Sequence, residues 1–272
     1  MPARPLRRVA PAIASLILVL PACSSSSSSK AFTAAAAAPA PTTTAVPVTG
    51  VLNVFAAASL AGAFNSAKPT LVAANPGLTI TYNFAGSNTL VTQMQQGAPA
   101  DVFASADIKN MQKLVAAGVV DTPVTFAKNK LEIAVAAGNP KAITGLADLA
   151  KPGITVVLEA AGVPAGDYTR QVLAAKSISI SPRSLETDVK SAVAKVTSGE
   201  ADATVVYVTD VAAAGPKVAG VPVADADQPP ITYPIAVVKA SKNRGAAQAF
   251  VDSTVSGAVQ KTLEGAGFLA PQ

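Results

Sequence analysis

From Val51 onward the sequence predicts an α/β protein with mostly parallel sheets. Runs of β-branched and aromatic residues that suit strands alternate with stretches in which apolar residues recur at helical spacing. The chain has 272 residues, 50% of them hydrophobic and 14% charged, which is enough for one or two compact domains with a buried core. In sheets of this kind, ligands bind beyond the carboxyl ends of the strands.

The first residues have the three parts of an export signal. A basic start is followed by an apolar run from Val9 to Leu20 that is too short for a comfortable membrane span. The run ends in LPAC, which resembles a bacterial lipobox although Pro21 replaces the usual small residue. We therefore expect residues 1–22 to be a lipoprotein signal peptide and Cys23 to carry lipid. The alternative is an ordinary signal peptide whose cysteine is incidental.

Residues 23–50 are expected to be a flexible, lipid-anchored linker, because serine, alanine, proline and threonine dominate and no apolar period survives. The protein is thus expected to be exported and held at the outer face of the cytoplasmic membrane. The formal charge of +5 includes arginines of the leader, and no basic patch is interleaved with aromatic residues. Nucleic acid is not an expected partner.

The remainder of the chain divides into alternating elements. An alternating or continuous apolar pattern predicts strands, and a helical spacing of apolar residues predicts helices. Pro69 is expected to kink the first helix or to end its first part. Strands are expected at residues 51–58, 78–86, 100–107, 131–137, 154–161, 203–208 and 233–240. Helices are expected around residues 60–67, 90–94, 111–118 and 148–149, after Pro164, at 189–196, and as one last helix over 246–263.

Three residue types that carry much enzyme chemistry are absent or nearly so. The sequence has no histidine and no tryptophan, and its only cysteine is Cys23. A Ser-His dyad, an imidazole metal ligand, an internal disulfide and a thiolate metal cluster are therefore excluded. We do not expect an enzyme.

Candidate binding residues lie where the chain enters helices. Ser59 and Ser87 each follow a strand and open a helix, Ala165 follows Pro164 at a third helix start, and Val189 lies near a fourth. Helix capping is the simpler explanation for each serine. Taken together, hydroxyl groups and the free amides of several helix N-termini predict a polar site with neutral donors, which suits a small oxyanion.

Several segments resemble the periplasmic molybdate-binding proteins that serve ABC importers. The resemblance covers residues 51–272 and rests on AAASL (56–60), FAGSNTL (84–90), GAPADVFASAD (97–107), VPAG (163–166), VVYVTD (205–210) and YPIAVV (233–238). It implies a type II periplasmic-binding-protein fold of two α/β lobes with a ligand cleft between them. Lobe 1 would comprise 51–130 and 234–272, and lobe 2 would comprise 131–233, with crossings near 127–131 and 231–234.

The resemblance also implies the ligand, molybdate or tungstate, caged without a cationic side chain. Ser59 and Ser87 would each supply a hydroxyl and an amide, Ala165 and Val189 an amide, and Tyr207 a hydroxyl. Taken alone, Tyr207 would more often be a core aromatic. Molybdenum would be bound as its oxyanion with no bond from metal to protein, and no cofactor is implied.

The implied partners are an ABC permease and, through Cys23, the membrane, and the protein itself is expected to be a monomer. The charged residues Asp167 and Arg170, near VPAG, are expected to lie at the surface.

Three other functions remain open from the residues. One is a binding protein for sulfate or another small oxyanion, phosphate being disfavoured because no acidic residue is seen at the site. Another is an exported hydrolase using Ser59 or Ser87, and the third is a structural lipoprotein without a ligand. Because no proposed donor titrates near neutrality, anion affinity is expected to be nearly flat between about pH 6 and 9.

Overall fold

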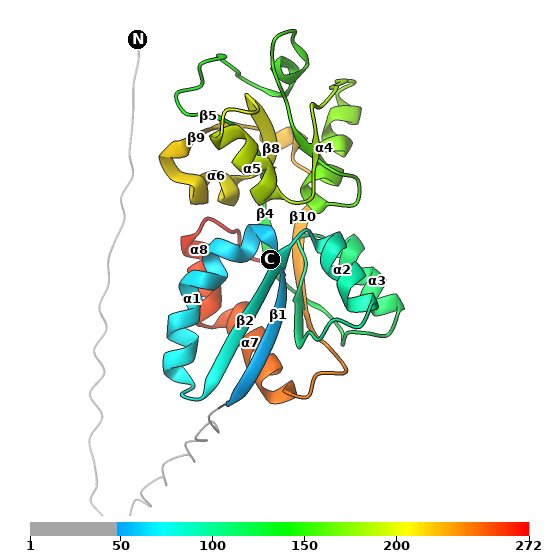
Figure 1. Ribbon diagram of the computed structural model, residues 1–272, viewed down its shortest axis with the longest axis vertical. Helices are drawn as coiled ribbons and strands as arrows, with labels where there is room; N and C mark the ends of the chain where they lie inside the picture. Colours follow the sequence, from blue (N-terminus) through cyan, green and yellow to red (C-terminus); the bar gives the residue numbers. More distant parts are fainter. Residues whose placement is uncertain (1–47, 272) are drawn as a thin grey trace, which may run out of the picture. The chain divides into compact units, whose positions relative to one another are not determined.

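The computed structural model describes residues 48–271, so the predicted signal peptide, Cys23 and most of the linker lie outside the described residues. Strands and helices form two lobes, each built around its own sheet (Figure 1). The α/β class predicted from the alternation is confirmed. The larger sheet has the order β2 (Leu78–Ala85), β1 (Gly50–Ala57), β3 (Val102–Ala104), β10 (Ile231–Val237), β4 (Val124–Asn129). The smaller lobe holds β8 (Ala203–Tyr207), β5 (Leu131–Ala136) and β9 (Val218–Pro222) in one sheet, and β6 (Leu158–Glu159) with β7 (Leu185–Glu186) in another.

Strand direction departs from the expected mostly parallel pattern. In the larger sheet β1 runs parallel to β2 and β3, whereas β10 runs antiparallel to β3 and β4. The three-stranded sheet is antiparallel throughout. The reason lies in the path of the chain. It leaves the larger lobe through β4, which leads into β5, and returns through β10, so the outgoing and returning strands run in opposite directions (Figure 1).

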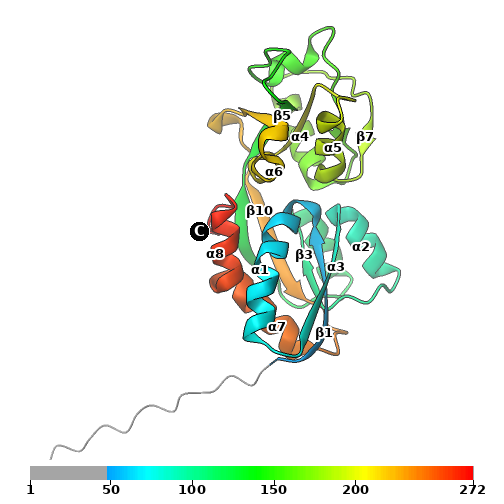
Figure 2. The same ribbon diagram turned by 60° about the vertical axis from the view of Figure 1, so that its left-hand side comes forward.

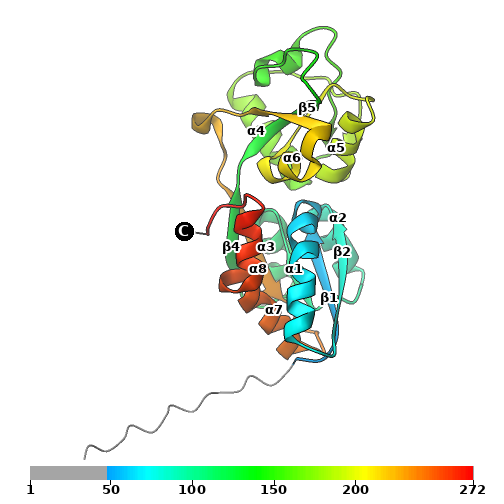
Figure 3. The same ribbon diagram turned by 90° about the vertical axis from the view of Figure 1, so that its left-hand side faces the viewer.

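Helices cover both faces of the larger sheet. Along β1, Val54 belongs to the core on one face and Phe55 to the core on the other, as the two-residue period of a strand requires. Figures 2 and 3 show α1 and α8 side by side on the first face. That face carries α1 (Ala61–Ala74), α7 (Arg244–Ser256) and α8 (Ala258–Gly265), and the other carries α2 (Ser87–Gln95) and α3 (Ile108–Ala116).

The smaller lobe has its own three helices. Buried residues of α5, among them Val189, Val193 and Val196, contribute to the core, as the sequence spacing predicted. The helices of this lobe are α4 (Pro164–Ala175), α5 (Val189–Thr197) and α6 (Val208–Ala214). Short 3-10 helices complete the described chain: η1 (Ala58–Leu60), η2 (Leu146–Ala150), η3 (Gly215–Lys217) and η4 (Asp225–Asp227).

Proline and glycine shape two helices differently from the prediction. Helix α1 continues through Pro69 to Ala74, and the carbonyl that proline deprives of a partner belongs to the exposed Asn65. The predicted single helix over 246–263 is wrong, because extended backbone at Gly257 separates α7 from α8. A Cβ at that glycine would lie 2.8 Å from the Cα of Ser253, so a side chain there would collide with the preceding turn.

Two predicted strands are shorter than expected. Only Leu158–Glu159 of residues 154–161 forms a strand, with an isolated bridge from Val156 to Ala203, and β3 spans only Val102–Ala104 of residues 100–107. Both segments were predicted as strands because they are hydrophobic, and they are hydrophobic because they are buried. A buried segment does not have to form hydrogen bonds to a neighbouring strand. Among the helices within residues 48–271, none combines the length and the apolar character that a membrane span requires.

Candidate functional site

A small cavity lies where loops and helix starts from both lobes meet. The space open to the centre of a water-sized sphere is about 10 Å³, close to the room that one water molecule needs. Of the predicted ligands, Ser87, Ala165, Val189 and Tyr207 line it, and Ser59 does not. The full lining consists of Ala57, Ala58, Ala85, Gly86, Ser87, Ala106, Val163, Pro164, Ala165, Asp188, Val189 and Tyr207. No lysine or arginine is among these described lining residues.

Two of the helices that begin at this cavity leave their first amides without a side-chain cap. Helix α2 starts after Gly86 and helix α4 after Val163, and neither N-cap residue has a side-chain hydrogen bond to the first turn. First-turn amides have no partner within a helix. Pro164 at the first position of α4 has no N–H, so Ala165 is the first residue of that helix that can donate. These amides are available to an anion, and the helix dipoles favour one.

Helix α5 is capped in a selective way. The Oδ1 atom of Asp188 accepts the amides of Lys190 and Ser191 at 2.9 and 3.0 Å, and the cap does not use the amide of Val189. The second oxygen, Oδ2, accepts the hydroxyl of Ser191 at 3.1 Å. Asp188 thus lines the cavity with its carboxylate engaged on its own helix. The expectation that no acidic residue lies at the site is wrong, although Asp before a helical apolar stripe is a recognisable N-cap signal.

Ser87 is fully buried, and its hydroxyl is already oriented. The Oγ atom accepts the backbone N–H of Ala106 at 3.1 Å. A serine hydroxyl that accepts one hydrogen bond keeps its own hydrogen to donate. Ala106 also lines the cavity, so this bond ties α2 to the segment after β3 at the site.

Tyr207 ends β8 at the cavity wall. Its hydroxyl oxygen is buried and has no hydrogen-bond partner among the described residues. Burial raises the pKa of Tyr207 well above its usual value, so the phenol stays a neutral donor. A buried hydroxyl without a partner is costly, on the order of 1–3 kcal/mol, and such a group in a cavity indicates a ligand that accepts its hydrogen.

Ser59 lies beside the cavity and contacts a second tyrosine. Its Oγ is 3.0 Å from the hydroxyl of Tyr233, and Asn129 Nδ2 donates to that tyrosine oxygen at 3.5 Å. If Tyr233 accepts from Asn129 and donates to Ser59, the serine hydrogen is free to point at a ligand. Its neighbours Ala57 and Ala58 line the cavity, and its ligand role stays a prediction.

The two lobes touch directly around the cavity. A Cβ added to Gly86 would lie 2.5 Å from the carbonyl oxygen of Thr187, so the larger lobe approaches the smaller one with bare backbone here. The start of α3 contacts the start of α4 as well, where Lys109 Nζ lies 2.8 Å from Asp167 Oδ2.

Asp167 and Arg170 are more than the surface charges the sequence predicted. Asp167 also accepts the amide of Gly162 and a guanidinium N–H of Arg170, both at 2.9 Å. Partial burial would raise the pKa of Asp167, but the hydrogen bonds from Lys109, Gly162 and Arg170 prevail and lower it to about 2.

Two carboxyl groups buried behind the site have raised pKa values. Burial raises the pKa of Glu159 to about 8, and both of its carboxyl oxygens lack a partner among the described residues. Burial also raises the pKa of Asp210, to about 6, against the opposing effect of Lys190 Nζ at 3.3 Å. Neither group was predicted as a site residue, because a carboxyl side chain within an apolar segment does not by itself reveal whether it faces inward without a partner.

The fold and the cavity together define a class of protein, the bacterial extracellular solute-binding proteins. The family model described as "Bacterial extracellular solute-binding protein" matches residues 52–269. The molybdate-binding protein ModA of Mycobacterium tuberculosis is 42% identical over 219 residues, which cover 80% of this chain and 84% of that protein. The chain therefore belongs to this solute-binding family and, within it, to the ModA proteins, which are transport proteins and not enzymes.

Solved structures share the fold at lower identity. The periplasmic molybdate-binding protein of Azotobacter vinelandii superposes with a TM-score of 0.68 at 22% identity, covering 81% of this chain and all (100%) of that one. The sulfate-binding protein SubI of Mycobacterium tuberculosis gives 0.67 at 24% identity, covering 80% of this chain and 86% of the other. The predicted periplasmic-binding-protein fold of two α/β lobes is confirmed.

Proposed function

We propose that this protein captures molybdate outside the cytoplasm and delivers it to the permease of an ABC importer. The observation that carries the proposal is the cavity at which α2, α4 and α5 begin, into which Tyr207 brings a hydroxyl without a partner. Its donors are neutral, and its lining contains no lysine or arginine among the described residues. Kinship with ModA proteins, one of which is 42% identical, supports molybdate as the anion.

Neutral donors are sufficient because there are many of them. A buried dianion loses a large hydration energy. In our proposal Ser59 and Ser87 each give a hydroxyl and an amide, and Ala165, Val189 and Tyr207 give one donor each. Hydrogen bonds to a charged group contribute roughly 1.5–3 kcal/mol each, so such a set offsets much of that loss.

A site in which donors are free and the one carboxylate of the lining is already engaged also selects among anions. A protonated oxyanion brings a hydrogen that needs an acceptor, and the carboxylate of Asp188 is already engaged by the amides of its own helix. Molybdate and tungstate, which have the same charge and shape, fit the proposal equally. Sulfate has shorter bonds and is the alternative ligand, supported by the fold shared with SubI.

Three further features complete the proposal. Cys23, which lies outside the described residues, carries a lipid that holds the monomeric protein at the outer face of the cytoplasmic membrane. Lobe 1 comprises 51–130 and 234–272, and lobe 2 comprises 131–233. The lobes close around the anion about the two crossings between them, because each lobe carries only part of the donor set.

Calorimetric titration of the protein with molybdate, tungstate, sulfate and phosphate tests the function. We expect molybdate and tungstate to bind, and each to raise the melting temperature; an anion at a hundredfold excess over its Kd stabilises the fold by about 2.7 kcal/mol. Tight binding of sulfate with weak binding of molybdate would establish the alternative ligand. No heat and no thermal shift with any of the four anions would refute the proposal.

Replacing Ser87 with alanine tests one donor of the cage. We expect Ser87→Ala to weaken molybdate binding roughly tenfold or more, because one hydrogen bond to the dianion is lost. Ser66→Ala, at an exposed serine of α1, is the matched control and should leave the affinity unchanged. Calorimetry measures both variants, and equal affinities for Ser87→Ala and the unaltered protein would count against the site.

A further inference from the structure

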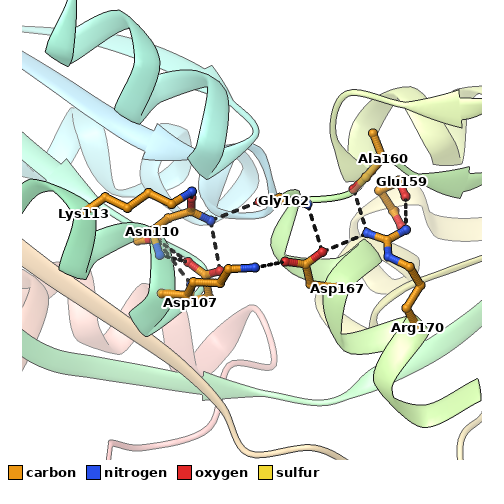
Figure 4. A network of polar contacts seen from close by, with 10 residues as sticks. Asp107, Asn110, Lys113, Glu159, Ala160, Gly162, Asp167 and Arg170 are labelled. Atoms are coloured by element: carbon orange, nitrogen blue, oxygen red, sulfur yellow. Dashed lines mark hydrogen bonds and ion pairs between the residues drawn. The ribbon is translucent and has the colours of Figure 1, made fainter. Parts of the chain in front are cut away.

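The contact between the first turns of α3 and α4 joins the two lobes at one side of the cavity (Figure 4). Asn110 of α3 donates from Nδ2 to the carbonyl oxygen of Gly162, at 3.1 Å, in the loop before α4. Beside this bond lies the ion pair between Lys109 and Asp167. Asn88 of α2 also faces Gly162, since a Cβ on that glycine would lie 3.8 Å from the Cβ of Asn88.

Asn110 is held in place by its own lobe. It is fully buried, its backbone amide donates to Asp107 Oδ1 at 2.9 Å, and its Nδ2 also donates to Asp107 Oδ2 at 2.9 Å. Its Oδ1 accepts from Lys113 Nζ at 2.8 Å. The side-chain amide is therefore oriented by partners of the larger lobe, so contact with the other lobe costs little ordering entropy.

The opposite side of the contact is braced as well. The N–H of Gly162 donates to Asp167 Oδ1 at 2.9 Å, and Arg170 donates to the carbonyl oxygens of Glu159 and Ala160 at 2.8 and 2.9 Å. Gly162 has a φ of 87°, a conformation that glycine adopts without strain. The braced loop leads directly into Val163, Pro164 and Ala165, which line the cavity.

Of the two bonds, the one from Asn110 is the more consequential. The side chains of Lys109 and Asp167 are 65% and 26% exposed, and ion pairs as exposed as this contribute little and weaken with salt. Asn110 is fully buried in the closed protein, so its bond to Gly162 is shielded from water and salt, and opening of the lobes exchanges this acceptor for water. A shielded hydrogen bond of this kind favours the closed state more than an exposed ion pair does.

We infer that Asn110 is a positioning residue for anion binding, which latches the closed lobes and, by holding the carbonyl of Gly162, fixes the loop that presents the amide of Ala165. The inference deepens the proposed function and rests on it for the identity of the anion. The latch touches no ligand. It acts by slowing reopening, so it should govern the dissociation rate more than the association rate.

Two measurements on Asn110→Ala test the latch. In stopped-flow experiments with molybdate, we expect dissociation to accelerate about tenfold, while association changes by less than about threefold. In hydrogen–deuterium exchange we expect faster exchange at residues 84–90 and 186–192, on the two sides of the cavity. A purely local role would raise exchange only around residue 110.

Asn65→Ala is the matched control, because it makes the same change at an exposed asparagine of α1. It should match the unaltered protein in both measurements. Lys113→Met removes one larger-lobe partner of the Asn110 side chain and leaves the bond to Gly162, so it should accelerate dissociation much less than Asn110→Ala.

Lys109→Met, at an exposed side chain, should accelerate dissociation slightly at low salt and not at high salt. If Asn110→Ala fails to fold, Asn110→Ser carries the test, because its shorter side chain keeps a hydroxyl beside Asp107 and gives up the bond to Gly162. A dissociation rate equal to that of the unaltered protein would then overturn the inference.

These measurements distinguish a failure of the latch from a failure of the proposed function. If the unaltered protein binds molybdate and Asn110→Ala matches it in dissociation rate and exchange, the latch is refuted and the function stands. If the unaltered protein binds none of the four anions, the proposed function fails. In that case hydrogen–deuterium exchange of the anion-free proteins tests the latch. If Asn110→Ala and the unaltered protein exchange alike at residues 84–90 and 186–192, the latch is refuted as well.

Discussion

Val189→Pro is expected to weaken molybdate binding by roughly 10- to 150-fold while leaving the protein folded, because it deletes one N–H bond to the dianion. Val189 is the first residue of α5, a position at which helices accept proline readily. Asp188 before it has φ −166° and ψ 169°, extended backbone of the kind a residue before proline adopts. The cap bonds to Lys190 and Ser191 do not involve the deleted amide.

The comparison that isolates the amide is Ala258→Pro, which makes the same change at the first position of α8, outside the cavity lining. Calorimetry gives the affinities, and circular dichroism with thermal unfolding of the anion-free proteins verifies the fold. If both proline variants bind molybdate as tightly as the unaltered protein, the amide of Val189 is not a ligand. If only Val189→Pro is impaired and its anion-free fold is intact, the backbone donor is established.

Glu159→Gln is expected to make the protein more stable at pH 8–9, by on the order of 3–5 kcal/mol, and to change its stability little near pH 5. The pKa of Glu159 is about 8 in the folded protein against 4.5 as the ordinary value. Between these values the folded state keeps a proton that the unfolded state has released. The free energy of unfolding therefore falls as pH rises from about 4.5 to 8, and glutamine, which does not ionise, removes that fall.

The groups around Glu159 set the size of this effect. Burial dominates, Asp210 and Asp188 raise the pKa further, and Arg170 lowers it. Asp210, with a pKa of about 6, contributes a fall in stability of the same sign at lower pH. Urea unfolding at several pH values measures the effect, with Glu264→Gln at an exposed helix position as the control. Parallel stability curves for Glu159→Gln and the unaltered protein would show that Glu159 has the same pKa in the folded and unfolded states, so that burial does not raise it.

Much of the candidate site follows from local sequence. Ser87, Ala165 and Val189 were predicted at helix starts, and the structure places all three at such starts and around one cavity. Helix starts are detectable because caps, proline and the onset of an apolar stripe are encoded within a few residues. The direction of the strands was harder to predict. The β-branched pattern of β5 is the same whether its neighbours run parallel or antiparallel.

The sequence by itself determined the α/β class, the places where helices begin and the absence of histidine chemistry, since each depends on composition or on neighbours in the chain. Only the tertiary structure decided that Ser59 contacts Tyr233, that Glu159 is buried without a partner and that Asn110 reaches Gly162. The residues of the first and last pairs are 174 and 52 positions apart in the chain. The physical reason is that burial and approach between distant segments arise from how the lobes pack, and short-range preferences do not record that packing.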